Sequence, residues 1–137
     1  MIAIDTNIVV RYLTGDHPVQ SAKARALIDA ETVFVSVTGM LESEWVLRSA
    51  YGYAPGDVVA ALRAFAGLPT VTVTDAPAVA AALDLCEGGM DFADALPLRL
   101  AAECERFFTF DRNFVKVAKS AGKTLAGRGE LPIVQPP

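Results

Sequence analysis

The fold is decided at residues 1–7, MIAIDTN. The first four residues are apolar, and the run ends abruptly in an acid, a hydroxyl and an amide. Residues 8–13 then have the length and mixed periodicity of a helix, so the pattern predicts a buried parallel strand followed at once by a helix. Functional groups of open α/β sheets gather at the carboxyl ends of strands. Asp5 stands at such an end, although Asp5, Thr6 and Asn7 are also good helix caps.

The same change from a short apolar run to a helix recurs along the chain. Further strand patterns occupy residues 32–36, 71–73 and 107–110, with a weaker one at 131–134. Helical patterns occupy residues 20–30, 41–51, 58–66, 78–86, 91–104 and 113–121. Short strands that alternate with helices indicate βαβ units. We therefore predict an α/β fold in which residues 1–137 form a single three-layer domain, with a central parallel sheet of four to five strands flanked by helices.

Composition excludes several classes of protein. A chain of 137 residues that is 53% hydrophobic is long and apolar enough for one well-packed domain. No apolar run approaches the roughly 20 residues of a membrane span, and the start lacks the pattern of a secretion signal, so we expect a cytoplasmic protein with no membrane partner. The single histidine, His17, reads as a surface turn residue. With one histidine and no CxxC pair between Cys86 and Cys104, a zinc site is not expected.

Charge is unevenly distributed along the chain. The net charge of −4 argues against nonspecific binding of nucleic acid by the whole surface. Half of the twelve Lys and Arg nevertheless lie in the last quarter of the sequence, at Arg106, Arg112, Lys116, Lys119, Lys123 and Arg128. A polyanion would dock there, although solvated helix ends collect basic residues as well.

Four acidic residues stand at equivalent places in the predicted topology. They follow a strand or open a helix at Asp5, Glu42, Asp94 and Asp111. If they converge, their like charges raise one another's pKa and oppose folding, and a hard divalent cation such as Mg²⁺ or Mn²⁺ removes that conflict. Such a cluster suits phosphodiester hydrolysis, in which one ion activates water and a second, about 4 Å away, stabilises the leaving oxygen.

The helix that carries Glu42 has an unusual beginning. Its helical pattern begins at Leu41, after Gly39 and Met40, so we expect the helix to start at about residue 41. Glu42 and Glu44 are two apart, about 200° around a helix, so Glu44 should point elsewhere and meet an arginine. The apolar residues near one stripe of this helix are Leu41, Trp45, Val46 and Leu47.

The helix that carries Asp94 contains a second acid and a proline. Asp91 and Asp94 are three apart and share one helical face, so Asp91 could reach the same site. Pro97 is tolerated only if the helix effectively starts near Asp94, which puts Pro97 in the first turn. Otherwise the helix should kink at Pro97.

Four segments together resemble the PIN-domain ribonucleases. They are IDTN at residues 4–7, Ser36 followed by LESEWVLR at 41–48, DFADAL at 91–96 and TFDRNF at 109–114. The similarity covers nearly the whole chain in the correct order, and it is strongest to the VapC-type toxins of prokaryotic toxin–antitoxin modules. It implies a PIN-like fold and a Mg²⁺- or Mn²⁺-dependent endoribonuclease that cleaves RNA through metal-activated water. It also implies a homodimer that is neutralised by a small antitoxin protein.

The resemblance also assigns roles to residues. The catalytic and metal-binding acids become Asp5, Glu42, Asp94 and Asp111, with Asp91 as a secondary acid. Thr6 or Asn7 would orient these acids through hydrogen bonds. Arg112 and Lys116 are candidates for gripping the RNA backbone.

Two other functions are compatible with the same residues. The chain could be a non-catalytic PIN-fold subunit of a DNA-binding regulatory complex, in which the acids only cap helices. A phosphatase for small molecules is a weaker alternative, because Asn7 stands where an aspartate-nucleophile enzyme needs a second acid. Apolar residues beyond one stripe, at Val9, Val10, Tyr51, Tyr53 and Phe65, indicate either a partner surface or core packing on both faces of the sheet.

Overall fold

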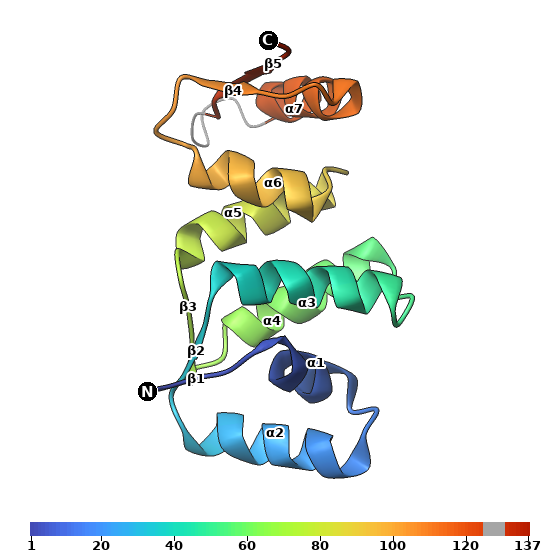
Figure 1. Cartoon of the computed structure of the whole chain (residues 1–137), viewed down its shortest axis with the longest axis vertical. Helices are drawn as coiled ribbons and strands as arrows, with labels where there is room; N and C mark the ends of the chain where they lie inside the picture. The colour runs from blue at the N-terminus through green and yellow to red at the C-terminus, as the bar shows by residue number, and fades with distance from the viewer. Residues whose placement is uncertain (125–130) are drawn as a thin grey trace. The chain divides into compact units, whose positions relative to one another are not determined.

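The computed structural model describes the backbone of residues 1–124 and 131–137 and the side chains of residues 1–122 and 131–137. These residues form two compact units, residues 1–76 and residues 77–137. Both units combine short parallel strands with helices (Figure 1), which confirms the α/β class predicted from the sequence. Within the described part of the chain, every helix is too short or too polar to cross a membrane.

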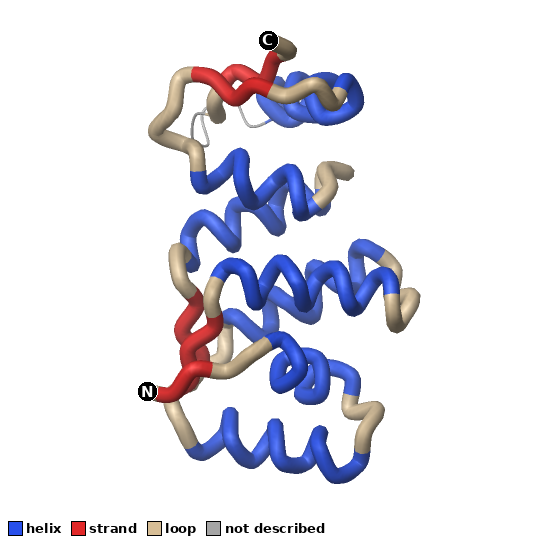
Figure 2. The backbone as a smooth tube through the Cα atoms, in the orientation of Figure 1, coloured by secondary structure: helices blue, strands red, loops and turns tan. Residues whose placement is uncertain are grey.

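Unit 1 contains three strands and four helices. In chain order these are β1 (Ile2–Ala3), α1 (Thr6–Thr14), α2 (Pro18–Ala30), β2 (Val33–Val35), α3 (Val37–Ser49), α4 (Pro55–Ala66) and β3 (Val71–Val73). The strands pair in parallel in the order β1-β2-β3, with Ile2 opposite Val33 and Val33 opposite Val71. They lie together as one short ladder in Figure 2. Two helices separate each pair of consecutive strands, as parallel connections require.

The core of unit 1 is built from aliphatic side chains on β2 and on the inner faces of its helices. Val33 and Val35 are fully buried, and α1 packs against α2 and α3. The rings of Tyr12 and Phe65 lie 5.6 Å apart and join α1 to α4. Val9, Val10 and Phe65 are buried, so core packing is the correct interpretation for these three residues, and Tyr51 and Tyr53 are half-buried.

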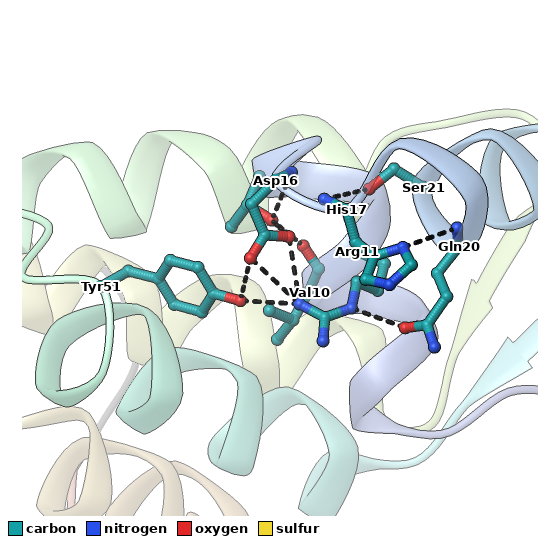
Figure 3. A network of polar contacts seen from close by, with 8 residues as sticks. Val10, Arg11, Asp16, His17, Gln20, Ser21 and Tyr51 are labelled. Carbon is teal, nitrogen blue, oxygen red and sulfur yellow. Dashed lines mark hydrogen bonds and ion pairs between the residues drawn. The ribbon is translucent and has the colours of Figure 1, made fainter.

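A polar network ties the ends of α1 and α3 together (Figure 3). The Arg11 guanidinium donates to both carboxylate oxygens of Asp16 at 3.0 Å and to the Tyr51 hydroxyl at 2.9 Å. The hydroxyls of Tyr51 and Thr14 in turn donate to Asp16. These hydrogen bonds, that from Tyr51 first, lower the pKa of Asp16 to about 2. Gly15 ends α1 in the left-handed region at φ +63°, a conformation that glycine adopts without strain.

Two helix starts in unit 1 test the turn predictions. His17 caps α2, where its Nδ1 accepts a hydrogen bond from the backbone N–H of Gln20 at 3.1 Å, which agrees with its interpretation as an exposed turn residue. The next helical pattern was predicted to begin at residue 58, and this start was wrong. The helix α4 starts earlier, at Pro55, because proline has the helical φ and lacks only an N–H that the first turn does not use.

Unit 2 contains the remaining elements. They are α5 (Ala76–Glu87), whose first residue closes unit 1, α6 (Phe92–Leu100), β4 (Arg106–Phe108), α7 (Arg112–Thr124) and β5 (Ile133–Gln135). The strands β4 and β5 pair in parallel, with Arg106 opposite Ile133. One face of this pair packs on α7, where the rings of Phe107 and Phe114 are 5.5 Å apart. The helix α6 ends at Leu100 rather than continuing to residue 104, because turn hydrogen bonds replace the helical ones from residue 102 onward.

The strands of the described residues form a three-stranded sheet in unit 1 and a two-stranded sheet in unit 2. The parallel direction expected from the sequence is confirmed in both sheets. One central sheet of four to five strands is not observed, and the joining of all strands into one sheet of a single three-layer domain stays a prediction.

Candidate functional site

Asp5 marks the end of β1. The backbone N–H of Ile4 donates to the carbonyl of Phe34 at 3.0 Å, so the ladder continues up to the residue before Asp5. Asp5 then caps α1, and its Oδ1 accepts from the backbone N–H of Ile8 at 3.3 Å. Thr6 is buried and Asn7 is exposed at the first two positions of α1. The capping role of Asp5 is therefore confirmed, and the orienting roles of Thr6 and Asn7 stay predictions.

The helix α3, which carries Glu42, begins at Val37 rather than near residue 41. Ser36 caps it, with its Oγ accepting from the backbone N–H of Gly39 at 3.0 Å. A Cβ on Gly39 would lie 3.2 Å from the Val35 Cγ1, so the missing side chain lets the first helical turn pack closely against β2. Met40 is fully buried. The late start expected from Gly39 and Met40 was wrong, because both residues serve this close packing.

The two glutamates of α3 have opposite surroundings. Glu42 is exposed, whereas Glu44 is only 5% exposed. Both carboxylate oxygens of Glu44 accept from the Arg48 Nε, at 2.9 and 2.7 Å. The expectation that Glu44 turns away from Glu42 and meets an arginine is confirmed, and Glu44 acts as part of the core of unit 1.

Trp45 does not lie on the buried face of α3. That face is formed by Met40, Ser43, Glu44 and Leu47, while Trp45 is 59% exposed. The apolar stripe proposed through Trp45 was wrong, because the helical period that runs through residues 40, 44 and 47 puts residue 45 on another face. A large exposed aromatic side chain beside Glu42 is thus a feature that the sequence interpretation missed.

Asp5 and α3 leave the same edge of the unit 1 sheet. The strands β1 and β2 are parallel neighbours, so the residues that follow both strands emerge at their shared carboxyl edge. Asp5 lies two residues after the end of β1, and Glu42 is the sixth residue of the helix that follows β2. This is the edge at which α/β sheets place their sites.

Asp94 of unit 2 lies within reach of the charges of two other acids. Asp91 is the N-cap residue of α6, Asp94 lies in the first turn of α6, and Asp111 precedes α7. Partial burial raises the pKa of Asp94, and the charges of Asp91 and Asp111 raise it further. The structure therefore brings Asp111 close enough to α6 to oppose ionisation of Asp94, as like charges in one site do. Asp111 also caps α7, with Oδ1 accepting from the backbone N–H of Phe114 at 3.0 Å.

Pro97 is accommodated inside α6. The helix starts at Phe92, not near Asp94, and Pro97 is its sixth residue. The ring removes the N–H that would bond to the carbonyl of Ala93, and the helix ends three residues later. The first turn is nevertheless formed, because the backbone N–H groups of Asp94 and Ala95 donate to the Asp91 carbonyl at 3.0 and 2.8 Å. Asp94 is held by this turn, upstream of the proline.

Basic residues line the exposed side of α7. Arg112 is its first residue, Lys116 lies one turn further on, and Lys119 follows on the same face; all three are exposed. The side chain of Lys123 and the whole of Arg128 lie outside the described part of the chain. The described residues of α7 therefore present a cationic face directly after Asp111.

The chemistry of the donor set fits a hard divalent cation. Every candidate ligand is a carboxylate, the donor type that Mg²⁺ and Mn²⁺ prefer. The cap hydrogen bonds of Asp5 and Asp111 use Oδ1 in both cases, so Oδ2 is the oxygen that a cation could contact. No group of three or more His, Cys, Asp or Glu side chains is arranged to hold an ion among the residues that the structure describes. Asp5 and Glu42 belong to unit 1 and Asp94 and Asp111 to unit 2, so the convergence of all four stays a prediction.

A comparison with protein families adds one finding. A family model described as PIN domain matches residues 2–120. The matched range includes all four candidate acids as well as Arg112 and Lys116. No curated relative and no solved structure matches the chain.

Proposed function

Because the chain belongs to the PIN domain family, whose members are generally nucleases that use divalent metals, we propose that it is a Mg²⁺- or Mn²⁺-dependent endoribonuclease. The observation that carries the proposal is the family match over residues 2–120, which spans every candidate acid. The crowding of carboxylates around Asp94 supports it, because an acid whose ionisation is opposed in the free protein gains when a cation binds.

Asp5, Glu42, Asp94 and Asp111 are the proposed metal ligands, with Asp91 as a secondary acid. A divalent cation at carboxylates supplies a water of lowered pKa and stabilises negative charge on a phosphate. The contribution of the chain is to hold these carboxylates at helix starts. The capping hydrogen bonds hold Asp5 and Asp111 in place. These carboxylates therefore need no reorganisation when the substrate binds.

Arg112 and Lys116 are proposed to hold the RNA backbone. Both are exposed on the first turns of α7, where the positive end of the helix dipole adds to their charge. A guanidinium at the helix start can bind a phosphate through two parallel hydrogen bonds. The reaction proposed is endonucleolytic hydrolysis of a phosphodiester bond beside this contact.

We further propose that the protein acts as the VapC-type toxin of a toxin–antitoxin pair. In this proposal it is a homodimer in the cytoplasm, and a small antitoxin protein blocks its activity. The resemblance of the four sequence segments to that group supports this finer assignment. Induced expression should stop growth, and growth should continue when Asp5→Asn is expressed instead.

The direct test is RNA cleavage by the purified chain with Mg²⁺ or Mn²⁺ and with a chelator. Asp5→Asn and Asp111→Asn are the sharpest variants, since asparagine caps helices as well as aspartate does but carries no charge. We expect both variants to fold and to lose cleavage. Asp29→Asn, which changes an exposed acid of α2, is the matched control and should cleave normally. Cleavage that survives in Asp5→Asn would refute the proposal.

The non-catalytic alternative is tested by metal binding. A PIN-fold subunit whose acids only cap helices should bind Mn²⁺ weakly, and Asp5→Asn should bind it equally weakly. The nuclease proposal expects calorimetric binding of Mn²⁺ by the wild-type chain and a large loss in Asp5→Asn. Equal heats for the two proteins would favour the alternative.

A further inference from the structure

Trp45 is an exposed aromatic side chain on the outward face of α3. It is 59% exposed, and it is the single tryptophan of the chain. Among the described residues, the ring–ring contacts join other aromatic side chains. An exposed indole has a large apolar ring face that can stack on a ligand, with a polar N–H at its edge. The ring of Trp45 is therefore available for a contact outside unit 1.

Glu42 lies on the same outward face. Residues three or four apart on a helix are neighbours, with their Cβ atoms roughly 5–6 Å apart. Going up α3, the exposed residues at this spacing are Thr38, Glu42, Trp45 and Ser49. The indole is thus one helical step from a proposed metal ligand. An RNA that is bound at Glu42 with its bases unstacked therefore comes within reach of the indole.

The backbone beneath Trp45 is firmly held. Glu44 and Arg48 form an ion pair on the neighbouring face, and the Ser49 hydroxyl donates to the Trp45 carbonyl at 2.6 Å. Ser43 donates to the Gly39 carbonyl at 2.7 Å, and Leu47 is fully buried. A rigid support lets an aromatic ring bind without a large loss of conformational entropy.

Charge decides what kind of contact this face can make. Unit 1, residues 1–76, carries five Lys and Arg against eight Asp and Glu, so it offers little attraction to phosphates. Nucleobases are uncharged and stack on exposed aromatic rings whatever their sequence. An unpaired base is therefore the part of an RNA substrate that can contact an indole on this acidic unit.

We propose that Trp45 stacks on an unpaired base of the RNA substrate next to the bond that is cleaved. The inference rests on the proposed nuclease function and adds a residue that positions the substrate. The bases of a duplex are already stacked on one another, so a blunt duplex lacks the free base that the indole would contact. Single-stranded RNA should bind through this residue, and blunt duplex RNA should not.

The single tryptophan makes the proposal measurable. In the Asp5→Asn background, which stops cleavage, a short single-stranded RNA of mixed sequence should quench the indole fluorescence, and a blunt duplex should not. In the cleaving protein, Trp45→Ala should raise KM by roughly 10-fold with little change in kcat, since base stacking on an aromatic contributes about 1–3 kcal/mol. Trp45→Phe keeps an aromatic ring, so its KM should lie close to the wild-type value. Val19→Ala, at another exposed apolar residue that is also 59% exposed, is the matched control.

The outcomes separate this inference from the proposed function. If the wild-type chain cleaves RNA but Trp45→Ala has the wild-type KM and the fluorescence does not change, only the stacking proposal is wrong. If no RNA is cleaved, the nuclease proposal fails, and the quenching experiment still decides whether the indole binds bases. If Trp45→Ala changes the oligomeric state on a sizing column and leaves KM unchanged, the indole contacts a second copy of the chain and the stacking proposal is overturned.

Discussion

Asp16 and Asp94, one in each unit, have surroundings that act in opposite directions. Asp16 accepts hydrogen bonds from Tyr51, Thr14 and Arg11, and its pKa is lowered to about 2. Asp94 is partly buried beside Asp91 and Asp111, and its pKa is raised. The folded chain therefore favours the charge of Asp16 and opposes that of Asp94. Asp16 therefore stabilises the fold, whereas Asp94 has the unfavourable charge expected of a functional site.

The largest effect is expected at Asp94, because the fold opposes the ionisation of its side chain. Asp94→Asn should lower metal-dependent RNA cleavage by roughly 100-fold or more, since even changes to residues behind metal ligands cost up to about that much. The same variant should be more stable than the wild-type chain at pH 7 without added metal, because the raised pKa of Asp94 means that its ionised form weakens the fold. Thermal unfolding in a chelator and a cleavage assay measure the two effects. A less stable Asp94→Asn would contradict the assignment of Asp94 as an opposed charge.

Glu44 and Glu42 show the same contrast between a stabilising acid and a functional acid within one helix. Glu44→Ala should lower the free energy of unfolding by about 2 kcal/mol, since it removes a nearly buried carboxylate and its ion pair with Arg48. Glu42→Ala, on the exposed face, should change stability by less than about 0.5 kcal/mol and yet abolish cleavage. Urea unfolding of both variants gives the stabilities. Equal losses of stability in the two variants would contradict the conclusion that Glu44 lies on the buried face of α3 and Glu42 on the exposed face.

Asp75 is a third aspartate, and its backbone conformation is unfavourable. Its φ of +50° lies in the left-handed region, which costs a residue with a Cβ about 1 kcal/mol and aspartate somewhat less. Asp75→Gly should therefore raise the free energy of unfolding by about 0.5 kcal/mol. The same change in the first turn of α4, Asp57→Gly, should lower stability, because glycine is a poor helix former. A loss of stability in both variants would show that the Asp75 side chain contributes more than its backbone costs.

The smallest effect is expected in the pH dependence of the Asp16 network, because the ion pair is solvent-exposed. The pKa of Asp16 is lower in the folded chain than its ordinary value of 3.8. Its contribution to stability is therefore complete above about pH 4 and is lost as the pH falls toward 2. Asp16→Asn should remove this part of the pH dependence, as measured by urea unfolding between these pH values. If the stability of Asp16→Asn falls as steeply with pH in this range as that of the wild-type chain, other carboxyl groups account for the pH dependence.

Local sequence was enough to place most elements. The apolar runs at residues 32–36 and 71–73 became β2 and β3, because β-branched residues in short runs fit few other structures. The acid after β1 became a helix cap, as its residue type allows. The start of α3 was misjudged, because the function of Gly39 depends on the distance of its Cα from Val35. That distance is fixed only when the helix packs on the strand.

Some features of the candidate site could likewise be predicted from local sequence, and others depend on tertiary packing. The opposite directions of Glu42 and Glu44 follow from two residues of helical rotation, and the structure confirms the arginine partner of Glu44. The exposure of Trp45 could have been inferred from the period of the buried residues of α3. The influence of Asp111 on Asp94 could not, because it depends on how α7 and α6 lie in unit 2.

The order of strands and helices, the cap at Asp5 and the oxygen-only set of candidate ligands follow from local sequence, because each depends on neighbours within a few residues. Which charges are stabilised and which are opposed depends on the tertiary structure. Asp16 and Asp94 are the same residue type, and their pKa values move apart. Hydrogen-bond donors from Tyr51, which follows α3, and from α1 surround Asp16, while partial burial and two other carboxylates act on Asp94. Electrostatic energies depend on distances in space, and the chain fixes those distances only by folding.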